Sequence, residues 1–342
     1  MSEKLVKLVE GSWFRHYKIA KKLGEGSFGA VYQVVNASAG DEFAMKVEST
    51  SEEESMIKME VAVLKTFRNS PFPHPHVCDY IDSGETPSFR YIIMQLCGQN
   101  LSDLRKTCSN NRFSESTTVR LGIQCVRSIE DLHRIGFLHR DIKPPNYAIG
   151  LGQAKRTVFL LDYGLARQYV DRHGRLRPPR KQVGFRGTVR FASLNAHLRK
   201  DLGRHDDLWS LLYMLVELQK GKLPWRKISG KDPVARMKKE MVADKLLEGM
   251  AQEFHAFQNE LAGLQFGDTP NYDFFCGLLR TIMQRKNYRD EAAFDWEEKG
   301  VAAKLQKTIV GRPMSPKKKD AKKSKKERGD EERSRLSERG KA

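Results

Sequence analysis

Four polar side chains in the stretch 139–164 have the types and spacing needed for chemistry on a phosphate group. In the run HRDIKPPN, one loop can direct Asp141, Lys143 and Asn146 at a single site. Asp141 can accept a proton from a hydroxyl group, and Lys143 can neutralise charge on a phosphoryl group. Asn146 and Asp162, the latter in LLDYG, offer the oxygen ligands that Mg²⁺ prefers. A polar surface loop is the alternative interpretation of this stretch.

A glycine-rich turn precedes this stretch. Gly24, Gly26 and Gly29 form GxGxxG, in which the absence of Cβ atoms lets the backbone approach phosphate groups. In a dinucleotide site the motif should open a helix directly, whereas strand-like alternation continues here from Val31 onward. We therefore expect a hairpin that covers ATP.

A lysine and a glutamate are expected to complete the phosphate-binding side of the site. Lys46 follows Ala44 in a predicted strand, EFAMKVE, and Glu60 lies in an apolar frame in the predicted helix MIKMEVAVLKTF. Solvent-exposed positions are the ordinary alternative for both charges. Because Lys46 follows the glycine turn closely, we favour contact with phosphate and an ion pair with Glu60.

Two long apolar helices are expected to position these residues. Segment 116–139 has apolar residues at helical spacing and leads into the loop that carries Asp141. Segment 204–225 is predicted to be a second buried helix, and Asp207 at its start can accept backbone N–H groups and hold the loop. Ser102 is a candidate cap for a helix that follows the hinge.

The segment after Gly164 is polar and is expected to be a mobile loop. Its basic residues near the expected substrate entrance are Arg177, Arg180, Lys181, Arg186 and Arg190. They form either a solvated charge run or a clamp for phosphate or carboxylate groups of a protein substrate, because arginine binds such anions bidentately. Arg140 could add to that clamp.

Length and composition allow one large domain or two packed lobes. The 342 residues include no apolar run near the roughly 18 residues of a membrane span, and the N-terminus lacks an apolar signal core. A cytoplasmic location is expected, with the nucleus as an alternative. The five cysteines are never spaced CxxC, which favours reduced structural cysteines. His74, His76 and Cys78 lack a suitably spaced fourth ligand, so no metal is expected there.

The net charge of +18 favours polyanionic partners, and part of it lies at the C-terminus. Residues 311–342 contain 13 Lys and Arg against 6 Asp and Glu, with almost no apolar residues, which predicts a basic disordered tail. This tail could bind microtubules or RNA, or direct nuclear import. It contains no aromatic residue for base stacking, so nucleic acid is not expected as a partner.

Together, GEGSFGAV, AMK, HRDIKPPN and DYG resemble a eukaryotic protein kinase domain over about residues 15–300. Most kinases carry Ala-Pro-Glu after the activation loop. This chain has FRGTVRFASLNAH instead, which resembles the casein kinase I group. GRHDDLWSL, LPWRKI, MQLCGQNLSDL and KMEVAVLK are similar to the tau-tubulin kinase branch of that group.

This resemblance implies an α+β fold with two lobes. The small N-lobe would be mainly antiparallel β-sheet with one key helix, and the larger C-lobe would be mainly helical. Residues 1–16 would be a lead-in and 17–310 the kinase domain, divided into an N-lobe of about 17–97 and a C-lobe of about 98–310. The basic tail would follow at 311–342.

The resemblance also implies roles for single residues and the use of ATP and Mg²⁺. The implied catalytic residues are Asp141 (base or substrate orienter), Lys143, Lys46, Glu60 and Thr188, which would hydrogen-bond near Asp141. The implied metal ligands are Asn146 and Asp162. The implied ATP-binding residues are Gly24, Gly26, Gly29, Val31, Ala44, Lys46, Met94 (the gatekeeper), Gln95 and Cys97 (hinge backbone groups) and Ala148 under adenine.

Two departures leave a second interpretation open. Tyr163 replaces the usual Phe and must find a partner for its hydroxyl, and Ala148 replaces a common Leu, which would make the floor of the cleft roomier. A pseudokinase scaffold is therefore the alternative. The complete catalytic set favours an active Ser/Thr kinase, which is expected to be a monomer. Its expected substrates are acidic or phosphorylated proteins, cytoskeletal proteins among them, and no membrane partner is expected.

Overall fold

The computed structural model describes residues 6–26, 29–51 and 54–297. These residues belong to the unit Met1–Glu298. The unit Lys299–Ala342, which contains the predicted basic tail, lies outside the described residues. Within the described ranges, no helix combines the length and apolar character that crossing a membrane requires.

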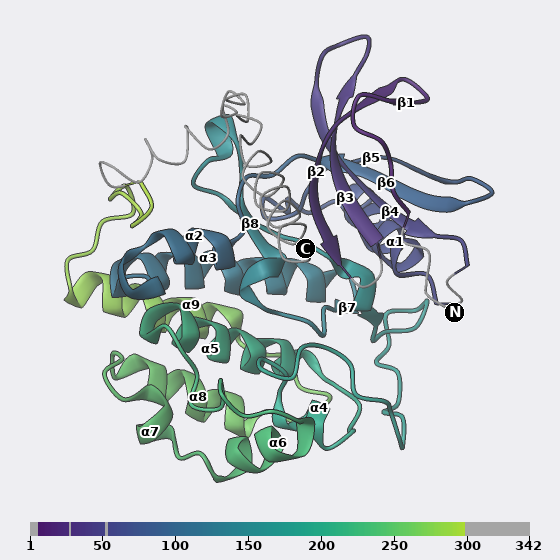
Figure 1. Ribbon diagram of the computed structural model, residues 1–342. Helices are drawn as coiled ribbons and strands as arrows, with labels where there is room; N and C mark the ends of the chain where they lie inside the picture. The colour runs from purple at the N-terminus through teal and green to yellow at the C-terminus, as the bar shows by residue number, and fades with distance from the viewer. Residues whose placement is uncertain (1–5, 27–28, 52–53, 298–342) are drawn as a thin grey trace, which may run out of the picture. The chain divides into compact units, whose positions relative to one another are not determined.

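Alternating burial along the N-terminal strands builds one antiparallel sheet. In β3 (Gly29–Asn36), Ala30, Tyr32 and Val34 are buried and their neighbours are more exposed, as the sequence alternation predicts. The strand order is β1-β2-β3-β4-β6-β5 (Figure 1). The other strands are β1 (Trp13–Phe14), β2 (Tyr17–Gly26), β4 (Glu42–Ser49), β5 (Tyr80–Glu85) and β6 (Phe89–Gln95).

One helix, α1 (Met56–Arg68), packs against β4, β5 and β6 of this sheet. The Ser55 side chain caps its N-terminus by accepting a hydrogen bond from the N–H of Lys58. Ile57, Leu64 and other apolar residues at helical spacing face the interior. Glu60 shares that face and is only 1% exposed, so its carboxylate needs a partner inside the protein.

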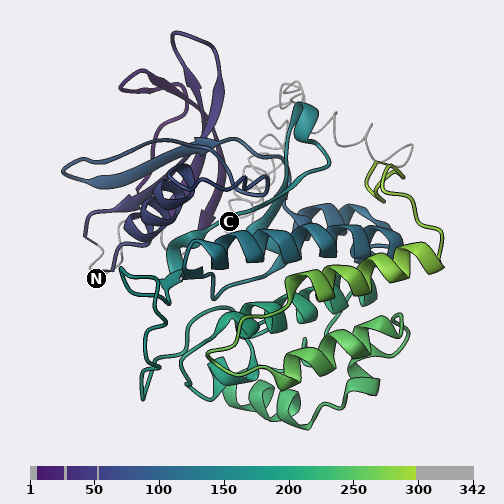
Figure 2. The ribbon, with the colours of Figure 1, turned by 180° about the vertical axis from the view of Figure 1, so that it is seen from behind.

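The remainder of the described chain is mainly helical (Figures 1 and 2). Its helices are α2 (Leu101–Thr107), α3 (Glu115–Arg134), α4 (Leu194–His197), α5 (Arg204–Lys220), α6 (Lys231–Glu240), α7 (Ala243–Leu247), α8 (Glu253–Gly263) and α9 (Tyr272–Arg285). The helix α3 packs against both α5 and α9. Two short sheets pair β7 (Phe137–Leu138) with β10 (Arg167–Gln168) and β8 (Tyr147–Ile149) with β9 (Val158–Leu160).

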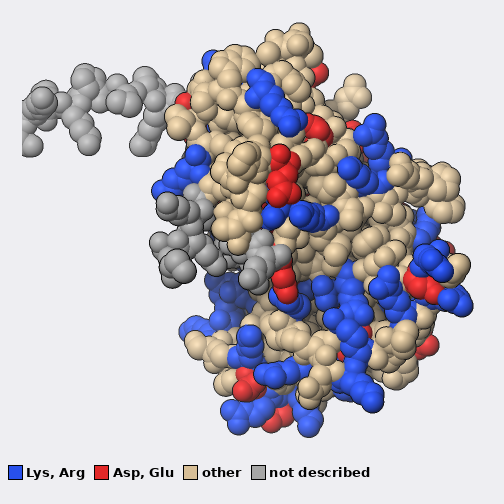
Figure 3. Space-filling view, turned by 90° about the vertical axis from the view of Figure 1, so that its right-hand side faces the viewer, with Lys and Arg blue, Asp and Glu red and all other residues tan. Residues whose placement is uncertain are grey.

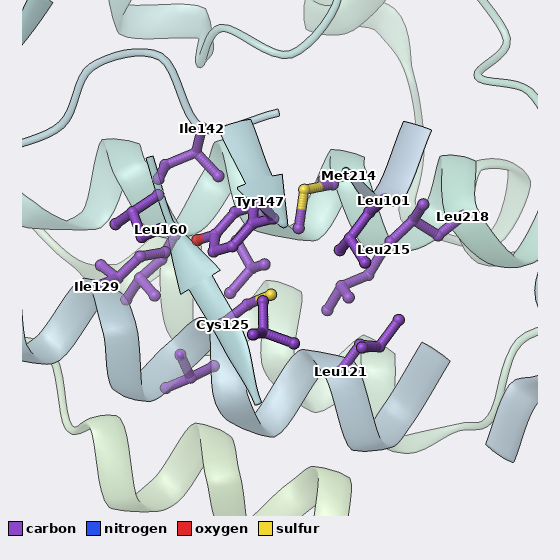
Figure 4. Close-up of a cluster of buried hydrophobic side chains, with 14 of the residues drawn as sticks. Leu101, Leu121, Cys125, Ile129, Ile142, Tyr147, Leu160, Met214, Leu215 and Leu218 are labelled. Carbon is purple, nitrogen blue, oxygen red and sulfur yellow. The ribbon is translucent and has the colours of Figure 1, made fainter. Parts of the chain in front are cut away.

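The largest core lies where α3 and α5 meet the β8–β9 pair (Figure 4). Cys125 and Ile129 of α3, Leu215 of α5, and Tyr147 and Leu160 of the two strands are fully buried there. Each buried side chain of this size contributes roughly 1.5–3 kcal/mol through the hydrophobic effect. Because the loop with Asp141 lies between α3 and β8 in sequence, this core fixes both of its ends.

The expected α+β architecture is confirmed: an antiparallel N-terminal sheet with one helix precedes a mainly helical region. Two local predictions were wrong. Asn100, rather than Ser102, caps α2 by accepting a hydrogen bond from the N–H of Asp103. The largely apolar run 91–96 also predicts a fully buried strand, but the structure buries it only through Met94, because the chain then leaves the sheet.

An arginine on α3 helps to hold the end of the helical region. Arg120, which is 4% exposed, donates hydrogen bonds to the carbonyl groups of Asp290, Ala292 and Ala293. Its guanidinium also lies 4.3 Å from the centre of the Phe294 ring. Since these carbonyls lie outside any helix, Arg120 supplies hydrogen bonds that secondary structure does not.

Replacing Arg120 with Met should therefore lower the free energy of unfolding by about 2–4 kcal/mol, because several carbonyl groups lose a charged donor. Chemical denaturation of the full chain measures this change. The exposed Arg236 provides the control, and R236M should alter stability by less than about 0.5 kcal/mol. Equal stability of R120M and R236M would contradict the prediction.

Candidate active site

One buried carboxylate, Asp207 at the start of α5, holds the loop that carries Asp141. Its two oxygens accept hydrogen bonds from the backbone N–H groups of His139 at 2.7 Å and Arg140 at 2.8 Å. The His133 ring of α3 lies 2.9 Å from the same carboxylate. Burial raises the pKa of Asp207, but these hydrogen bonds outweigh burial, so the net pKa is lowered. The carboxylate therefore joins α3, α5 and the loop.

Asp141 is held at both of its oxygens. Thr188 donates to Oδ1 from its N–H and from its hydroxyl, each at 2.8 Å. The ammonium of Lys143 lies 2.5 Å from Oδ2 and 3.2 Å from the Thr188 hydroxyl. Asn146 donates its amide N–H to the Asp141 carbonyl at 2.9 Å, which leaves the amide oxygen for another ligand. Two segments far apart in sequence thus meet at one carboxylate.

This close approach requires a glycine before Thr188. Gly187 has a φ of +97°, and a Cβ atom there would lie 2.5 Å from the carbonyl oxygen of Arg140. Any larger residue would strain the backbone and push Thr188 away from Asp141. The side chain of Arg140 is engaged elsewhere, because its Nε donates to the Leu165 carbonyl at 2.8 Å.

Lys46 joins three elements through two ion pairs. Its Nζ lies 2.7 Å from Oε2 of Glu60 in α1 and 2.7 Å from Oδ1 of Asp162, which follows β9. The charge of Lys46 lowers the pKa of Asp162 to about 2. Burial lowers the pKa of Lys46, but Asp162 and Glu60 raise it more, and the net pKa is raised. Lys46 and Asp162 are therefore both charged at neutral pH.

Tyr163 finds the partner that its hydroxyl requires. The ring is 1% exposed and lies near Phe67 and His139. Its hydroxyl donates a hydrogen bond to the carbonyl oxygen of Leu160 at 2.9 Å. The extra oxygen is thus accommodated within the same chain segment, and the neighbouring Asp162 keeps its contact with Lys46.

The glycine-rich turn connects β2 and β3, with residues 27–28 outside the described ranges. Gly24 and Gly26 have open space where a Cβ atom would lie. A Cβ atom at Gly29 would lie 1.9 Å from the carbonyl oxygen of Val47 in β4. Gly29 is therefore required by strand packing, whereas a Cβ atom at Gly24 or Gly26 would meet no neighbouring atom.

The residues expected near adenine come from both lobes. Ala44 and Met94 are neighbours across β4 and β6, and Val31 pairs with Lys46 across β3 and β4. Ala148 is buried in β8. The residue after Met94, Gln95, donates its backbone N–H to the Asp79 carbonyl at 2.9 Å, so this N–H group is already occupied.

Cys97 lies where the chain leaves the sheet, and it is half buried. Its Sγ is 3.3 Å from Sγ of Cys78, and both cysteines are free thiols. The sequence pattern gave no sign of this proximity, because pairing of β5 with β6 creates it. The next residue, Gly98, donates its N–H to the Ile149 carbonyl at 2.7 Å and so joins the hinge to the helical region.

The basic residues proposed as either a solvated charge run or an anion clamp have separate partners. Arg180 pairs with Asp201 at 2.9 Å, Arg186 with Glu54 at 2.9 Å and Arg190 with Glu217 at 3.4 Å. Arg177 donates to the Val170 carbonyl, and Lys181 is exposed. Figure 3 shows Lys and Arg side chains gathered over the lower, mainly helical half of one face. Carboxylates thus partly neutralise three of these five basic residues, namely Arg180, Arg186 and Arg190.

Two residues that hold the site were absent from the expected set. The His133 ring forms hydrogen bonds with two residues: its Nε2 lies 2.9 Å from the Asp207 carboxylate, and its Nδ1 lies 2.7 Å from the Tyr272 hydroxyl. Asn195 lies 3.1 Å from Asp206, where it joins the segment after Thr188 to α5. The run FASLNAH marked this segment as unusual, but only the fold shows which partner Asn195 contacts.

Comparison with known proteins agrees with this geometry. The family model described as "Protein kinase domain" matches residues 17–285. The chain belongs to the protein kinase family. A probable serine/threonine-protein kinase of Dictyostelium discoideum is 40% identical over 291 residues, which cover 85% of this chain and 57% of that protein. The serine/threonine-protein kinase spe-6 of Caenorhabditis elegans is 33% identical over 290 residues, covering 82% of this chain and 75% of spe-6. The chain therefore spans little more than half the length of the first relative.

The Asp207→Asn variant should test how far this kinase domain depends on one carboxylate. An amide cannot accept hydrogen bonds at both positions, so one buried N–H group of the loop loses its partner. We expect the free energy of unfolding to fall by about 2–4 kcal/mol, as measured by denaturation.

Asp244 is a suitable control because its side chain is 94% exposed. The D244N variant should be as stable as the unchanged chain. A loss in D207N no larger than that in D244N would show that the loop does not depend on Asp207.

Proposed function

We propose that this chain is a serine/threonine protein kinase, which transfers the γ-phosphoryl group of ATP to a protein hydroxyl. The observation that carries the proposal is the double restraint on Asp141, with Thr188 on one oxygen and Lys143 on the other. Such a carboxylate is oriented before a substrate arrives, which is how positioning lowers a barrier.

The residues of this chain have distinct proposed tasks. Asp141 orients the substrate hydroxyl and accepts its proton, while Lys143 neutralises charge near the transferred group. Lys46, held by Glu60, contacts the ATP phosphates, and the open space at Gly24 leaves room for them. The apolar residues of β3, β4, β6 and β8 line the adenine position, where the proposed contacts are Val31, Ala44, Met94, Ala148 and the backbone of Gln95 and Cys97.

The donor set at Asn146 and Asp162 fits Mg²⁺. The Asp162 side chain is 44% exposed and only Oδ1 contacts Lys46, while the amide nitrogen of Asn146 is occupied. Among the described residues, no group of three or more His, Cys, Asp or Glu could hold a metal ion alone. Two protein ligands together with phosphate oxygens are a usual arrangement for Mg²⁺, which when bound neutralises phosphate charge.

We also place the chain in the casein kinase I group, near its tau-tubulin kinase branch, on the basis of FASLNAH and GRHDDLWSL. The link from Asn195 to Asp206 supports this assignment, because it ties down the segment that in most kinases carries Ala-Pro-Glu. Acidic or phosphorylated proteins are the proposed substrates. The net charge of +18 and the exposed Arg177 and Lys181 support that preference.

A pseudokinase scaffold is the weaker candidate. Tyr163 was its main support, and the hydroxyl of Tyr163 is satisfied without disturbing Asp162. Binding of polyanions or microtubules through residues 311–342 would be an accessory activity. That segment lies outside the described residues, so the proposal for it rests on its charge alone.

Phosphate transfer from Mg-ATP to casein and to an acidic Ser peptide tests the main proposal. The Asp162→Asn variant should lose at least about 100-fold in kcat, since it removes a metal-binding carboxylate and the partner of Lys46. D244N is the matched control and should retain full activity. A chain that binds ATP but transfers no phosphate would favour the scaffold instead.

The substrate preference has its own test. The double variant Arg177→Ala/Lys181→Ala should raise KM for an acidic peptide about threefold or more and leave KM for a neutral peptide unchanged, because only the acidic peptide loses attraction. The control removes the same charge at the exposed Arg280 of α9 and the exposed Lys286, which follows that helix. Equal changes in KM for the two peptides would contradict the proposed preference.

A further inference from the structure

An isolated lysine is buried beneath the segment that carries Thr188. Lys238 lies on α6 and is 6% exposed. Within the described part of the chain, no carboxylate lies at ion-pair distance from its ammonium group. A buried charge without a counterion is costly, and a methionine of similar volume would avoid that cost. The fold must therefore use the ammonium group for hydrogen bonding.

The ammonium group binds the segment directly after Thr188. Its Nζ donates to the carbonyl oxygens of Val189 at 2.9 Å and Ala192 at 2.6 Å. The third neighbour is Nε2 of His197, 3.3 Å away. Burial and the adjacent Lys238 lower the pKa of His197 to about 4, so its ring is neutral and can accept a hydrogen bond. All three donors of the ammonium group thus have acceptors.

Two aromatic rings complete the environment of the charge. Nζ lies 5.0 Å from the centre of the Tyr213 ring and 5.1 Å from that of Trp225, which favours a cation. The indole N–H of Trp225 also donates to the Arg190 carbonyl at 2.8 Å. Lys238 and Trp225 therefore hold the carbonyl groups of three residues in the turn after Thr188, namely Val189, Arg190 and Ala192.

We propose that Lys238 is a positioning residue for phosphoryl transfer: by holding the turn 189–192, it keeps Thr188 on Asp141. This inference rests on the proposed kinase function and adds a residue remote from the reacting atoms. Lys238 binds the carbonyl group of Val189, and Val189 is joined to Thr188 by one peptide bond. Thr188 in turn donates both of its hydrogen bonds to Oδ1 of Asp141. In a chain without Ala-Pro-Glu, this lysine and Asn195 together fix the segment.

The decisive variant is Lys238→Met, which is compared with the conservative variant Lys238→Arg. Lys239→Met is the matched control, because Lys239 is exposed on the same helix. In the full chain, K238M should lower kcat about 10- to 100-fold and raise KM for the peptide, because Asp141 is less well oriented. KM for Mg-ATP should stay within about twofold, because Lys238 touches no residue of the proposed ATP site. K238R should recover part of kcat, and K239M should match the unchanged chain.

A merely structural role would give a different pattern. Loss of thermal stability together with equal losses for ATP and peptide would overturn the inference, as would an unchanged kcat in K238M. If K238M does not fold, Lys238→Gln keeps two N–H donors and should show a smaller fall in kcat with ATP binding intact. An unchanged kcat in folded K238Q would count equally against the inference.

Hydrogen–deuterium exchange separates this inference from the proposed function. The peptide 187–193 should exchange faster in K238M than in K239M, even if neither protein transfers phosphate. Faster exchange in a chain without activity would contradict the proposed function and support the role of Lys238 in holding the turn. Unchanged exchange in an active chain would contradict that role of Lys238 and support the proposed function.

The pH profile gives a second readout. Burial lowers the pKa of Lys238 to about 7, so its charge is lost as the pH rises through neutrality. The groups that face it are the His197 ring, the two aromatic rings and the carbonyl oxygens, and none of these titrates between pH 7 and 9. In the unchanged chain kcat should decline on the alkaline side, and in K238R this decline should move to higher pH because guanidinium stays charged. Identical alkaline limbs would contradict the inference.

Discussion

The carboxylate of Asp207 is the constraint on which the rest of the site depends. The loop that carries Asp141 contains no helix or strand at His139 and Arg140, so their N–H groups have no partners in secondary structure. Asp207 supplies those partners from inside the helical core. Because α5 is held by apolar packing against α3, the stability of the core is transmitted to a loop that could not hold its own shape.

A second constraint acts at Lys46. Lys46 brings one strand, one helix and the segment after β9 to a single ammonium group. Each of those elements is fixed by its own packing: β4 by the sheet, α1 by its apolar face and β9 by β8. Packing within the chain therefore brings the two carboxylates to the lysine, which preorganises the proposed phosphate-binding side of the site.

Much of this arrangement could be predicted because it is encoded locally. The strand alternation after Gly29, the helical spacing around Glu60 and the run HRDIKPPN each identify an element or a loop from neighbouring residues alone. Asp207 could also be predicted, since a carboxylate at a helix start next to such a loop has a clear electrostatic use.

Contacts made by distant segments could not be predicted in this way. The proximity of Cys78 and Cys97 depends on the register of β5 against β6, and the partners of Arg180 and Arg190 depend on where Asp201 and Glu217 lie. A charge run shows how many cations a loop carries, but their availability depends on carboxylates contributed by other elements. For that reason the sequence could not show that three of these five cations lie in separate ion pairs.

The buried hydroxyl of Tyr163 has a consequence for small-molecule inhibition. A compound that binds by expelling this ring from its pocket must break the hydrogen bond to the Leu160 carbonyl and leave that oxygen without its donor. In a chain with phenylalanine at this position, the same displacement would break no such bond. Inhibitors that require the ring to leave should thus bind this protein less tightly, by about 1 kcal/mol, whereas compounds confined to the adenine position should be insensitive to the tyrosine.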